Sequence, residues 1–508
     1  MSTKIFTLKV IGAAIFIALI VAIVGSVITG HRLKKASNNP KKYGIVLDAG
    51  SSHTALYVYE WPAEKQNDTG VIAQRHHCRV EGGGISSYSS SPSGAGESLR
   101  ACMDEAKAIV PKDRWADTPL ALGATAGMRL LEMSDSVAAK AVLSSVREVL
   151  VSSPFSYHEA RIISGQEEGT YGWMTANYFL YNFIQFTWLG TWQWTTSTKP
   201  IGALDLGGAS TQITFMTEEP LQGSPDSLTI QLYGRKYHVY SHSYLCYGRD
   251  QAIKRFLSTL YKASPGAQVD NPCYPRFDSV AYNLSDIYDS PCTSDARPAN
   301  YDPNRSVIFR GTADPAACIN TISSIFKFSA CNSPNCTFDG VWQPPVQGQF
   351  LAFSCFYHTM AAFNFTNPKP SLNDATVAFN NYCRRTWNEV NAQHPGVEAE
   401  RLRDYCFQAY YVYTLLIKGY KFDEESWKNI NFQKEAGGGE LGWALGFMLN
   451  VTNMVPVEKL PDLFSTAIVG FSFVFHLAIL LAVACFLYVV HYRSASAKDK
   501  RGDSHTVI

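Results

Sequence analysis

Two segments far apart in the chain repeat one pattern, and this repeat constrains the fold more than any other feature. Asp48-Ala-Gly-Ser-Ser-His-Thr54 and Asp205-Leu-Gly-Gly-Ala-Ser-Thr211 each follow a short apolar run and precede residues of β character. Each pattern predicts a β-hairpin with a tight glycine turn. Glycine lets the backbone approach a phosphate, and the N–H and hydroxyl groups of such a turn can bond its oxygens. The Asp at each strand end can hold a hydrated divalent cation. Two such turns predict duplicated lobes around a nucleotide.

Length and charge narrow the class of protein. A chain of 508 residues predicts two domains or one large bilobal unit. The net charge is +1, and no basic tract with interleaved aromatics occurs, so we expect no nucleic-acid partner. Charged residues make up only 17%, and the apolar runs 10–29 and 465–490 explain much of this deficit.

Each apolar run is long enough to cross a bilayer core of roughly 30 Å. The first run could instead be a cleaved signal peptide, but its length favours an uncleaved anchor. The second run precedes a basic segment, 491–508, which is the flank expected on the cytosolic side. We therefore predict two transmembrane helices, 10–29 and 465–490.

The positions of the cysteines and of the glycosylation acceptors indicate on which side of the membrane each segment lies. All of the 12 cysteines except Cys485 lie between the two apolar runs. The Asn-x-Ser/Thr acceptors also lie there, at Asn67, Asn283, Asn304, Asn335, Asn364 and Asn450. Both features fit an oxidising lumen or the cell exterior. We expect a multi-pass plasma-membrane protein with an extracellular domain, and with residues 1–9 and 491–508 in the cytosol.

The segment between the runs reads as α/β. A polar linker covers 36–42, and the Ser, Gly and Pro residues of 86–96 predict a loop. Apolar residues at helical spacing predict a helix over Glu97–Val110, and 120–122 reads as a strand. A second helix is predicted over 134–151, with Ser134 as its N-cap. Alternating strands and helices indicate α/β lobes.

Some features leave alternatives open. The aromatic-rich stretch 178–194 is either lobe core or a loop that touches the bilayer, where Trp and Tyr favour the headgroup zone. Cys355 lies in an aromatic run and is our candidate for the unpaired ectodomain cysteine, as a buried inert thiol. Cys485, inside the second run, is apolar filler or a palmitoylation site, and we favour filler.

Two adjacent carboxylates, Glu167 and Glu168, lie between glycines in the segment 165–173. They could simply form the acidic first turn of a helix. Hydrolysis of a phosphoanhydride, however, needs a base that orients or deprotonates water, and either Glu fits that role. Nearby, Thr125 and Arg129 belong to a small-residue turn; Arg129 could contact phosphate or pair with a structural carboxylate.

A covalent nucleophile is not indicated. The chain has no Walker A sequence, no Gly-x-Ser-x-Gly elbow and no Cys/His pair at a recognisable spacing. His53 could be a phosphohistidine nucleophile, but a hydrogen-bond donor to phosphate is the simpler interpretation.

The motifs together carry a resemblance to a known family. They are Asp48-Ala-Gly-Ser-Ser-His-Thr, Ala124-Thr-Ala-Gly-Met-Arg, Gly165-Gln-Glu-Glu-Gly-x-Tyr-Gly-Trp, Asp205-Leu-Gly-Gly-Ala-Ser-Thr-Gln and Gly442-Trp-Ala-Leu-Gly. In this order they resemble the five apyrase-conserved regions of the ecto-nucleoside triphosphate diphosphohydrolases, or ecto-apyrases. The resemblance spans residues 43–455, and the two-anchor layout is similar to that of the cell-surface branch.

The resemblance implies a bilobal actin/hexokinase-like α/β fold with an RNase H-like core in each lobe and nucleotide in the cleft. Lobe I would cover residues 39–164 and be completed by about 433–460. Lobe II would cover residues 165–432.

The resemblance also assigns roles to matching residues. Glu168 would be the catalytic base, and Ser210 and Gln212 would help to position the water. Asp48 and Asp205 would hold Ca²⁺ or Mg²⁺ through its water shell, with Trp443 near that shell. Phosphate contacts would come from Ser51, Ser52, His53, Thr125, Ala126, Gly207, Gly208, Ala209 and Ser210. Tyr357 and Tyr405 would stack on the base, with Arg249 and Arg401 beside it.

The family's pairing of ectodomain cysteines would give Cys78–Cys102, Cys246–Cys292, Cys273–Cys318, Cys331–Cys336 and Cys383–Cys406. This pairing leaves Cys355 free.

The leading hypothesis is extracellular hydrolysis of nucleoside tri- and diphosphates (ATP, ADP, UTP, UDP), which ends or reshapes purinergic signalling. A sugar kinase is disfavoured because a kinase outside the cell lacks abundant ATP. From another class, the alternative is an ATP-sensing receptor or adhesion ectodomain without turnover. The expected partners are nucleotides and the bilayer, with a homo-oligomer formed through the spans, where His476 is polar. The tail His505-Thr-Val-Ile508 resembles a PDZ-domain ligand.

Overall fold

The computed structural model describes residues 12–13, 16–17, 20, 23–24, 40–187, 191–195, 198–331, 335–456, 477, 479–493 and 495. Lys41–Pro456 form one compact unit, here called the body, and the two terminal segments form another. In the part of the chain that the structure describes, no helix is both long and apolar enough to cross a bilayer. The predicted spans 10–29 and 465–490 lie largely outside the described residues.

The first sheet of the body has five strands in the order β3-β2-β1-β4-β5. Strands β1, β2 and β3 pair antiparallel, whereas β1, β4 and β5 pair parallel. The strands are β1 (Lys41–Ala49), β2 (Thr54–Pro62), β3 (Ala73–Arg79), β4 (Pro119–Ala124) and β5 (Ser156–Ile162).

The second sheet repeats this order and adds one edge strand, as β10-β11-β9-β8-β15-β16. Again the hairpin strands pair antiparallel and the next two strands pair parallel to the first. The strands are β8 (Gly202–Leu206), β9 (Ser210–Thr217), β10 (Ser227–Leu232), β11 (Arg235–Leu245), β15 (Phe350–Ser354) and β16 (Ile430–Phe432). The predicted duplication is therefore present at the level of strand order.

Both predicted hairpins are confirmed, and their registers match. In the β1–β2 hairpin Asp48 lies opposite Ala55, and in the β8–β9 hairpin Asp205 lies opposite Gln212. Each Asp is therefore the last residue but one of its strand, just before the glycine-containing turn. The same strand position in both sheets brings a carboxylate to the same kind of edge.

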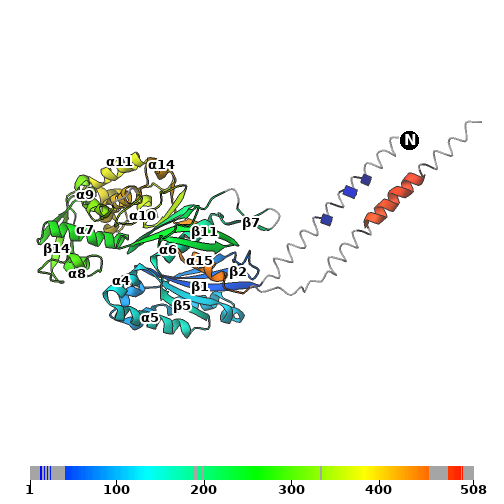
Figure 1. The fold of residues 1–508 in the computed structure, drawn as a ribbon, viewed down its shortest axis with the longest axis horizontal. Coiled ribbons are helices and arrows are strands. Elements are labelled where there is room, and N and C mark those ends of the chain that lie inside the picture. Colours follow the sequence, from blue (N-terminus) through cyan, green and yellow to red (C-terminus); the bar gives the residue numbers. More distant parts are fainter. Residues whose placement is uncertain are drawn as a thin grey trace, which may run out of the picture. The chain divides into compact units, whose positions relative to one another are not determined.

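Helices α6 and α15 lie between the two sheets (Figure 1). Helix α6 (Gly165–Phe179) packs on β8, β9 and β11, helix α15 (Ala444–Thr452) packs on β1 and β2, and the two helices pack on each other. A Cβ on Gly169 would lie 2.7 Å from Thr214 Oγ1, and one on Gly446 would lie 2.0 Å from the Tyr171 carbonyl oxygen. Only glycine permits these two close approaches.

The remaining helices cover the outer faces of the sheets (Figure 1). On the first sheet they are α2 (Pro92–Ser98), α3 (Arg100–Ile109), α4 (Ala126–Ser134) and α5 (Ser136–Val151). The second lobe carries α7 (Arg249–Ala263), α8 (Leu284–Tyr288), α9 (Pro315–Ser324), α10 (Cys355–Ala362), α11 (Leu372–Cys383), α12 (Trp387–Gln393), α13 (Ala399–Tyr413) and α14 (Glu424–Trp427). Small sheets are formed by β12 (Gln268–Asn271), β13 (Ser279–Asn283) and β14 (Ser306–Gly311), by β6 (Ile184–Phe186) and β7 (Trp192–Trp194), and by β17 (Glu435–Ala436) and β18 (Gly439–Glu440).

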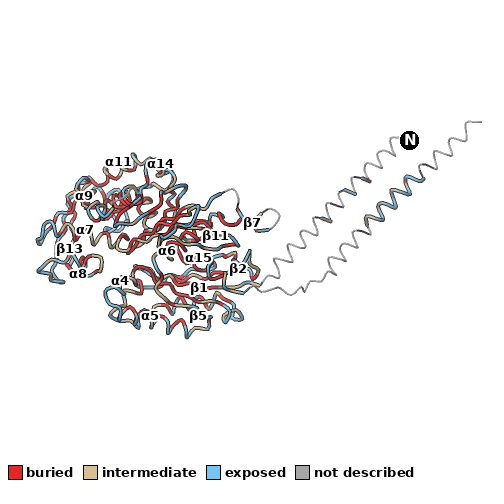
Figure 2. Tube along the Cα trace, viewed as in Figure 1, coloured by how far each residue is buried: buried red, intermediate tan, exposed pale blue. Residues whose placement is uncertain are grey.

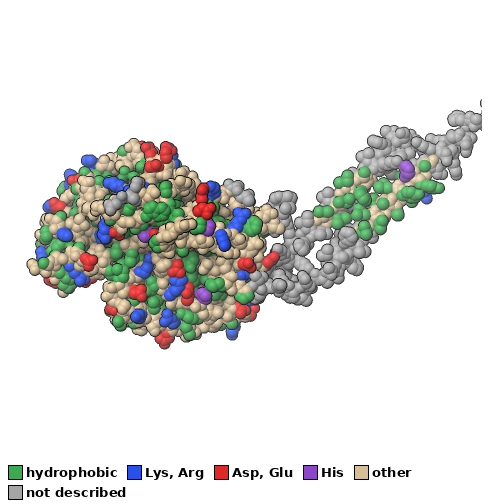
Figure 3. Space-filling view, in the orientation of Figure 1, with side chains coloured by type: hydrophobic (Ala, Val, Ile, Leu, Met, Phe, Trp, Pro, Cys, Tyr) green, Lys and Arg blue, Asp and Glu red, His purple; other side chains and the backbone are tan. Residues whose placement is uncertain are grey.

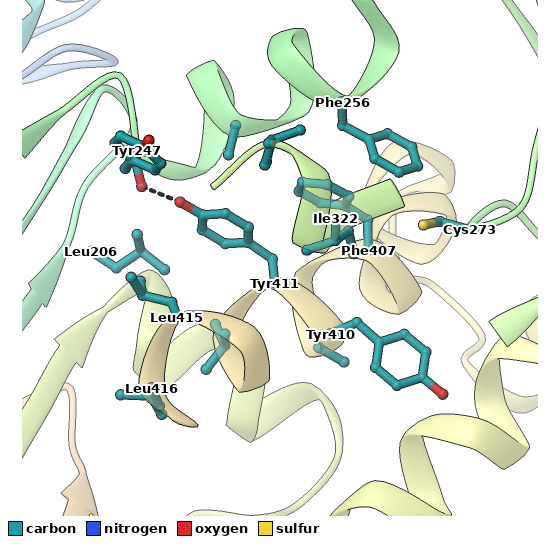
Figure 4. Close-up of a cluster of buried hydrophobic side chains, with 14 of the residues drawn as sticks. Leu206, Tyr247, Phe256, Cys273, Ile322, Phe407, Tyr410, Tyr411, Leu415 and Leu416 are labelled. Atoms are coloured by element: carbon teal, nitrogen blue, oxygen red, sulfur yellow. Dashed lines mark hydrogen bonds between the residues drawn. The ribbon is translucent and has the colours of Figure 1, made fainter. Parts of the chain in front are cut away.

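Buried residues follow the sheets and the helices between them (Figure 2). The largest cluster, in the second lobe, is rich in aromatic side chains. Within it the Tyr411 hydroxyl donates to the Tyr247 carbonyl, so a buried polar group is paired inside the apolar core (Figure 4). Charged side chains of both signs are interspersed on the face of the body seen in Figure 3.

The cysteines pair as the resemblance implies. The disulfides are Cys78–Cys102, Cys246–Cys292, Cys273–Cys318, Cys331–Cys336 and Cys383–Cys406. Among the described residues Cys355 and Cys485 are free. Burial raises the pKa of the Cys355 thiol to about 12, which keeps it protonated and unreactive at neutral pH.

Two local predictions were wrong. The stretch 86–96 is not all loop, because α2 begins at Pro92, a residue that fits the first turn of a helix. The N-cap of α5 is Asp135, whose carboxylate accepts from the N–H groups of Val137 and Ala138. Ser134 instead ends helix α4. The negative charge of a carboxylate at the N-cap also interacts favourably with the positive end of the helix dipole, whereas a neutral serine hydroxyl carries no such charge.

Part of the aromatic stretch 178–194 belongs to the core, and part lies on an exposed hairpin. Phe179 and Phe183 are buried in the core, whereas Phe186 and Trp194 on the β6–β7 hairpin are largely exposed. Contact of the hairpin with a bilayer stays a prediction.

The close contact of α15 with α6 yields a stability test. Gly446→Ala should lower the free energy of unfolding by about 1–3 kcal/mol, because its Cβ would collide with the backbone of α6. Gly442→Ala is the matched control, since its Cβ would meet nothing within 4 Å. Denaturant unfolding of the ectodomain measures both. Equal stabilities of the two variants would contradict the packing argument.

Candidate functional site

Both hairpin turns open into one cavity of about 400 Å³. From the predicted first lobe it is lined by Asp48, Gly50, Ser51, Ser52, His53, Tyr57, Thr125, Ala126, Lys434, Glu440, Leu441, Gly442 and Trp443. From the predicted second lobe it is lined by Glu168, Asp205, Leu206, Gly207, Gly208, Ala209, Ser210, Arg249, Ser354, Cys355, His358 and Arg401. The structure thus gathers every predicted phosphate-binding and cation-binding residue around one space.

The two turns approach each other closely. A Cβ built on Gly208 would lie 2.7 Å from Ser51 Oγ of the opposite turn and 2.5 Å from Asp250 Oδ2. Any larger residue at position 208 would therefore fill the gap between the turns. Glycine keeps the backbone N–H groups of this turn open toward a ligand.

Four helices present their N-termini to the same cavity. Thr125 precedes α4, Arg249 begins α7, Cys355 begins α10 and Trp443 precedes α15. None of these four helices has a side-chain cap, but the first N–H groups of α7 donate to the Gly207 and Gly208 carbonyls, and the Gly446 N–H of α15 donates to Thr175. The positive ends of the four helix dipoles nevertheless favour a bound anion. The cavity is therefore suited to a ligand with several negative charges.

Glu167 and Glu168 have different surroundings. Glu167 forms a capping box with Ser164 and accepts from Arg161 Nη1 and Nη2 at 2.9 and 2.8 Å. Glu168, one residue on, is 8% exposed and lies in the cavity wall. Glu167 therefore serves the acidic first turn of the helix, as one of the two interpretations held, whereas of the two adjacent carboxylates only Glu168 can reach a ligand in the cavity.

Glu168 is held by side chains from two other elements. Arg129, from α4, donates to Glu168 Oε2, and Gln212 Nε2, from β9, lies 3.1 Å from the same oxygen. Gln212 Nε2 also lies 2.8 Å from Ser210 Oγ, to which Arg129 Nη2 donates at 3.3 Å. Of the two alternatives for Arg129, the structure has it paired with a carboxylate. The carboxylate of Glu168 and the hydroxyl of Ser210 are thus fixed in one hydrogen-bond network.

The carboxyl groups of the site are too buried to carry their charges easily. Burial raises the pKa of Asp48 to about 8, an effect that Trp443 partly offsets and that Glu168 and Asp205 reinforce. Burial likewise raises the pKa of Glu168 to about 7, against the opposing effect of Arg129. For Asp205, burial raises the pKa to about 6, while Ser354 and the Leu206 N–H stabilise the anion. A nearby cation would favour the charged forms of all three.

The donor set fits a cation bound through water. Asp48 Oδ1 and Asp205 Oδ1 are buried without a hydrogen-bond partner, and so is the indole Nε1 of Trp443. Within the described residues, no three His, Cys, Asp or Glu side chains converge closely enough to hold a metal directly. The two carboxylate oxygens without partners can accept hydrogen bonds from water bound to a cation. Because the protein offers too few ligands to coordinate the cation directly, the site suits Ca²⁺ or Mg²⁺ that keeps most of its waters.

The predicted base-binding residues are only partly brought together. Arg249 and Arg401 line the cavity. Tyr357 lines a neighbouring cavity of about 860 Å³, which shares Lys434 with the first. Tyr405 lines neither, and packs within 6.2 Å of the Tyr382 ring. Stacking of a base between Tyr357 and Tyr405 stays a prediction.

Some lining residues escaped the sequence analysis. Ser354, Lys434 and Glu440 belong to no recognised motif, yet all three line the cavity. Ser354 carried a usable signal, because it follows an apolar run as Asp48 and Asp205 do. Lys434 and Glu440 flank the glycine-rich turn of the β17–β18 hairpin, and no local pattern places that hairpin at the site.

Comparison with known proteins gives consistent matches. Residues 34–463 match the GDA1/CD39 (nucleoside phosphatase) family. The chain is 46% identical to human ectonucleoside triphosphate diphosphohydrolase 2, over 89% of this chain and 91% of the relative. It is 43% identical to human ectonucleoside triphosphate diphosphohydrolase 3, over 91% and 88% of the two chains.

Among solved structures, the nucleoside triphosphate hydrolases from Neospora caninum superpose with a TM-score of 0.59 and 16% identity. The match covers 85% of this chain and 96% of that one. This likeness shows a shared fold, in agreement with the mixed α/β, actin/hexokinase-like class that was predicted.

The buried carboxyls make stability depend on pH when no cation is present. Their pKa values are raised in the folded protein, so it retains protons that the unfolded chain releases, and stability should fall as pH rises from about 4 to about 8. Asp48→Asn removes the group with the highest of the three pKa values. In EDTA this variant should therefore gain stability relative to the wild type as pH rises.

Thermal unfolding in EDTA between those pH values provides the measurement. Ca²⁺ added at the upper pH should stabilise the wild type more than Asp48→Asn. A constant difference between the two proteins at all pH values would contradict the assignment.

Proposed function

This chain belongs to the GDA1/CD39 (nucleoside phosphatase) family, and we propose that it hydrolyses extracellular nucleoside tri- and diphosphates to monophosphates and inorganic phosphate. The substrates are ATP, ADP, UTP and UDP, and the reaction ends or reshapes purinergic signalling. The observation that carries the proposal is the burial of Glu168 in the wall of a cavity to which two glycine turns contribute.

Glu168 is the catalytic base. Its pKa of about 7, raised by burial, suits a group that takes a proton from water near neutral pH. Ser210 and Gln212 fix its position and offer a second contact to the same water. The water attacks the terminal phosphorus in line with the leaving phosphate, and the P–O bond to that leaving group breaks.

The phosphate chain is bound by the two turns and the helix N-termini. Backbone N–H groups of Gly208 and Ala209, and the hydroxyls of Ser51 and Thr125, surround it, whereas the Gly207 N–H donates to the Ser210 carbonyl within the turn. His53 is exposed to the cavity as a donor, and burial lowers its pKa, so it acts as a neutral donor. Oriented donors of this kind stabilise charge that develops on the leaving oxygen.

Asp48 and Asp205 hold a divalent cation, Ca²⁺ or Mg²⁺, through its water shell, with the Trp443 indole beside it. When bound, the cation neutralises phosphate charge and the charges of these carboxylates. Tyr357 and Tyr405 stack on the base, with Arg249 and Arg401 at its edge. Stacking on a π-face tolerates any base, which fits several nucleotides as substrates.

The body lies outside the cell, held by spans 10–29 and 465–490, with both ends in the cytosol. The disulfides and the exposure of all six glycosylation acceptors support this topology. Lobe boundaries at 39–164 with 433–460, and at 165–432, follow from the same resemblance. Oligomerisation through the spans and a PDZ-domain partner at the tail are further parts of the proposal.

A nucleotide-sensing or adhesion ectodomain without turnover is not favoured. Relatives that match along nearly the whole chain are named as hydrolases. A receptor has no need for a buried base beside a water-positioning serine and glutamine.

The choice between the adjacent carboxylates provides the direct test. Glu168→Gln should reduce phosphate release from ATP at least about 10³-fold, because the amide cannot take the proton from water. Glu167→Gln is the matched control, since Glu167 pairs with Arg161 and does not line the cavity, and it should retain most activity. Phosphate release by intact cells, with Ca²⁺ or with EDTA, measures both.

Equal loss of activity in the two variants, at equal surface expression, would contradict the assignment of Glu168. A wild type that releases no phosphate would sink the enzyme proposal itself. The ratio of the ADP rate to the ATP rate then distinguishes an apyrase from a triphosphatase.

Topology is tested separately. Epitope tags at the N-terminus and at the C-terminus should become accessible to antibody only after the cells are permeabilised. Digestion with an N-glycosidase should lower the apparent mass of the surface protein, because its acceptors are exposed. A tag detected on intact cells would refute a cytosolic location for that end.

A further inference from the structure

Ser243 lies on strand β11 of the second sheet, against the start of helix α6. In the antiparallel register it lies opposite Gln212 of β9, which in turn lies opposite Asp205 of β8. Its side chain is half-buried and does not line the cavity. The proposed mechanism gives this serine no role, although it is the cross-strand neighbour of a residue that holds the proposed base.

One hydrogen bond joins Ser243 to the network around Glu168. Gln212 Nε2 donates to Ser243 Oγ at 3.0 Å. The same nitrogen lies 3.1 Å from Glu168 Oε2 and 2.8 Å from Ser210 Oγ. Glu168 and Ser210 line the cavity, whereas Ser243 does not. The amide nitrogen of Gln212 is therefore held from the cavity side by two acceptors and from behind the cavity wall by the third.

The orientation of the Gln212 amide follows from these partners. An ionised carboxylate can only accept hydrogen bonds, so the nitrogen of the amide, and not its oxygen, must face Glu168. The amide oxygen, Oε1, is buried without a partner among the described residues. It therefore does nothing to fix the amide, and the orientation depends on the contacts that the nitrogen makes.

The other donor to Glu168 has no comparable anchor. Arg129 donates to Glu168 Oε2 and to Ser210 Oγ, while its Nε is buried without a partner in the described part of the chain. When Glu168 takes a proton it loses its charge, which weakens the charge-assisted bond from Arg129. The bond between Gln212 and Ser243 joins two neutral groups, so it does not depend on that charge. Ser243 thus anchors the network in both protonation states of the base.

Gly165, the first residue of α6, confines the Ser243 side chain. A Cβ built on Gly165 would collide with Ser243 Oγ and with Arg129 Nη1. Any larger residue at position 165 would therefore displace one of these side chains. The close packing of the helix start keeps the serine hydroxyl beside Gln212, three residues before Glu168 in the same helix.

We propose that Ser243 is a positioning residue for the hydrolysis: its hydroxyl anchors the Gln212 amide, which in turn holds Glu168 and Ser210 against the attacking water. The inference rests on the proposed function, because it assumes that Glu168 is the base. Ser243 touches neither the substrate nor the cation and acts through Gln212. Its loss leaves the binding surfaces intact and loosens the group that takes the proton.

A second serine on the same strand provides the matched control. Ser241 lies opposite Thr214 and, two residues from Ser243, on the same face of the sheet. Its hydroxyl hydrogen-bonds to Thr214 Oγ1 at 2.7 Å and to the Gln166 carbonyl at 3.2 Å. Ser241 is fully buried, and its printed bonds do not reach Glu168 or its partners. The same substitution here tests the packing beneath α6 without touching the network.

Phosphate release from ATP by the full-length protein, with kcat and KM measured separately, tests the proposal. Ser243→Ala should lower kcat about 10-fold and change KM less than about twofold, since a shift of about 1 Å in a catalytic group can cost about 10²-fold in rate. Ser241→Ala should keep the kcat of the wild type. It should lower the melting temperature at least as much as Ser243→Ala, because it removes two buried hydrogen bonds.

A double variant tests the route of the effect. Because Ser243 acts through Gln212, adding Ser243→Ala to Gln212→Ala should lower kcat no further. Two independent losses would instead multiply.

A Ser243→Ala protein with the kcat of the wild type would overturn the inference. An equal fall of kcat in both serine variants would also overturn it, by assigning the effect to packing beneath α6. So would a raised KM at unchanged kcat, or losses that multiply in the double variant. A wild type that releases no phosphate, or a Glu168→Gln protein with full activity, would overturn the proposed function itself, and neither result needs a Ser243 variant to be recognised.

Discussion

The gathering of three carboxyl groups around one cavity, Glu168 buried and Asp48 and Asp205 half-buried, is the constraint on which the rest of the site depends. Asp48, Glu168 and Asp205 lie where burial raises each pKa, so their charged forms are costly without a cation nearby. Hydrophobic packing alone would not select such an arrangement. It is held because apolar clusters in each lobe, and a third cluster shared by both sheets, fix the strands and the helix that carry these side chains. The polar groups therefore meet at fixed positions, as a polyphosphate site requires.

Duplication of the sheet explains how two symmetric carboxylates arise. In each sheet the first strand carries Asp as its last residue but one and turns through glycine into the second strand, and the parallel neighbour lies on the other side. The halves then differ in detail. β4 ends beside the first turn and leads to the N-terminus of α4, whereas β15 ends in Ser354 and leads to α10. The common scaffold fixes the positions of the two carboxylates, and the differences between halves set how each is supported.

Helices α6 and α15 connect the site to the cores of both lobes. Each packs on one sheet and on the other helix, and Gly169 and Gly446 permit the close approach. The Gly446 N–H, in the first turn of α15, donates to Thr175 Oγ1 of α6 at 2.9 Å. Glu168 lies in the first turn of one of these helices and Trp443 precedes the other, so any shift between the helices would move the proposed base and the proposed cation site. Rigid packing at this layer keeps the base and the cation site in register.

The sequence by itself determined the elements whose signals are local. Periodicity and glycine placement predicted both hairpins and the apolar face of the helix around Leu99 and Met103, which are buried. The family resemblance added the cysteine pairs and the list of site residues. Tertiary structure decided what depends on direction and on distant partners. Glu167 and Glu168 are adjacent in a helix, where neighbouring side chains point about 100° apart, so sequence cannot say which one reaches the cavity. The contacts of Arg129 and Gln212 with Glu168 join segments separated by long stretches of chain. Such contacts follow from how whole sheets pack, and no local pattern of residues encodes them.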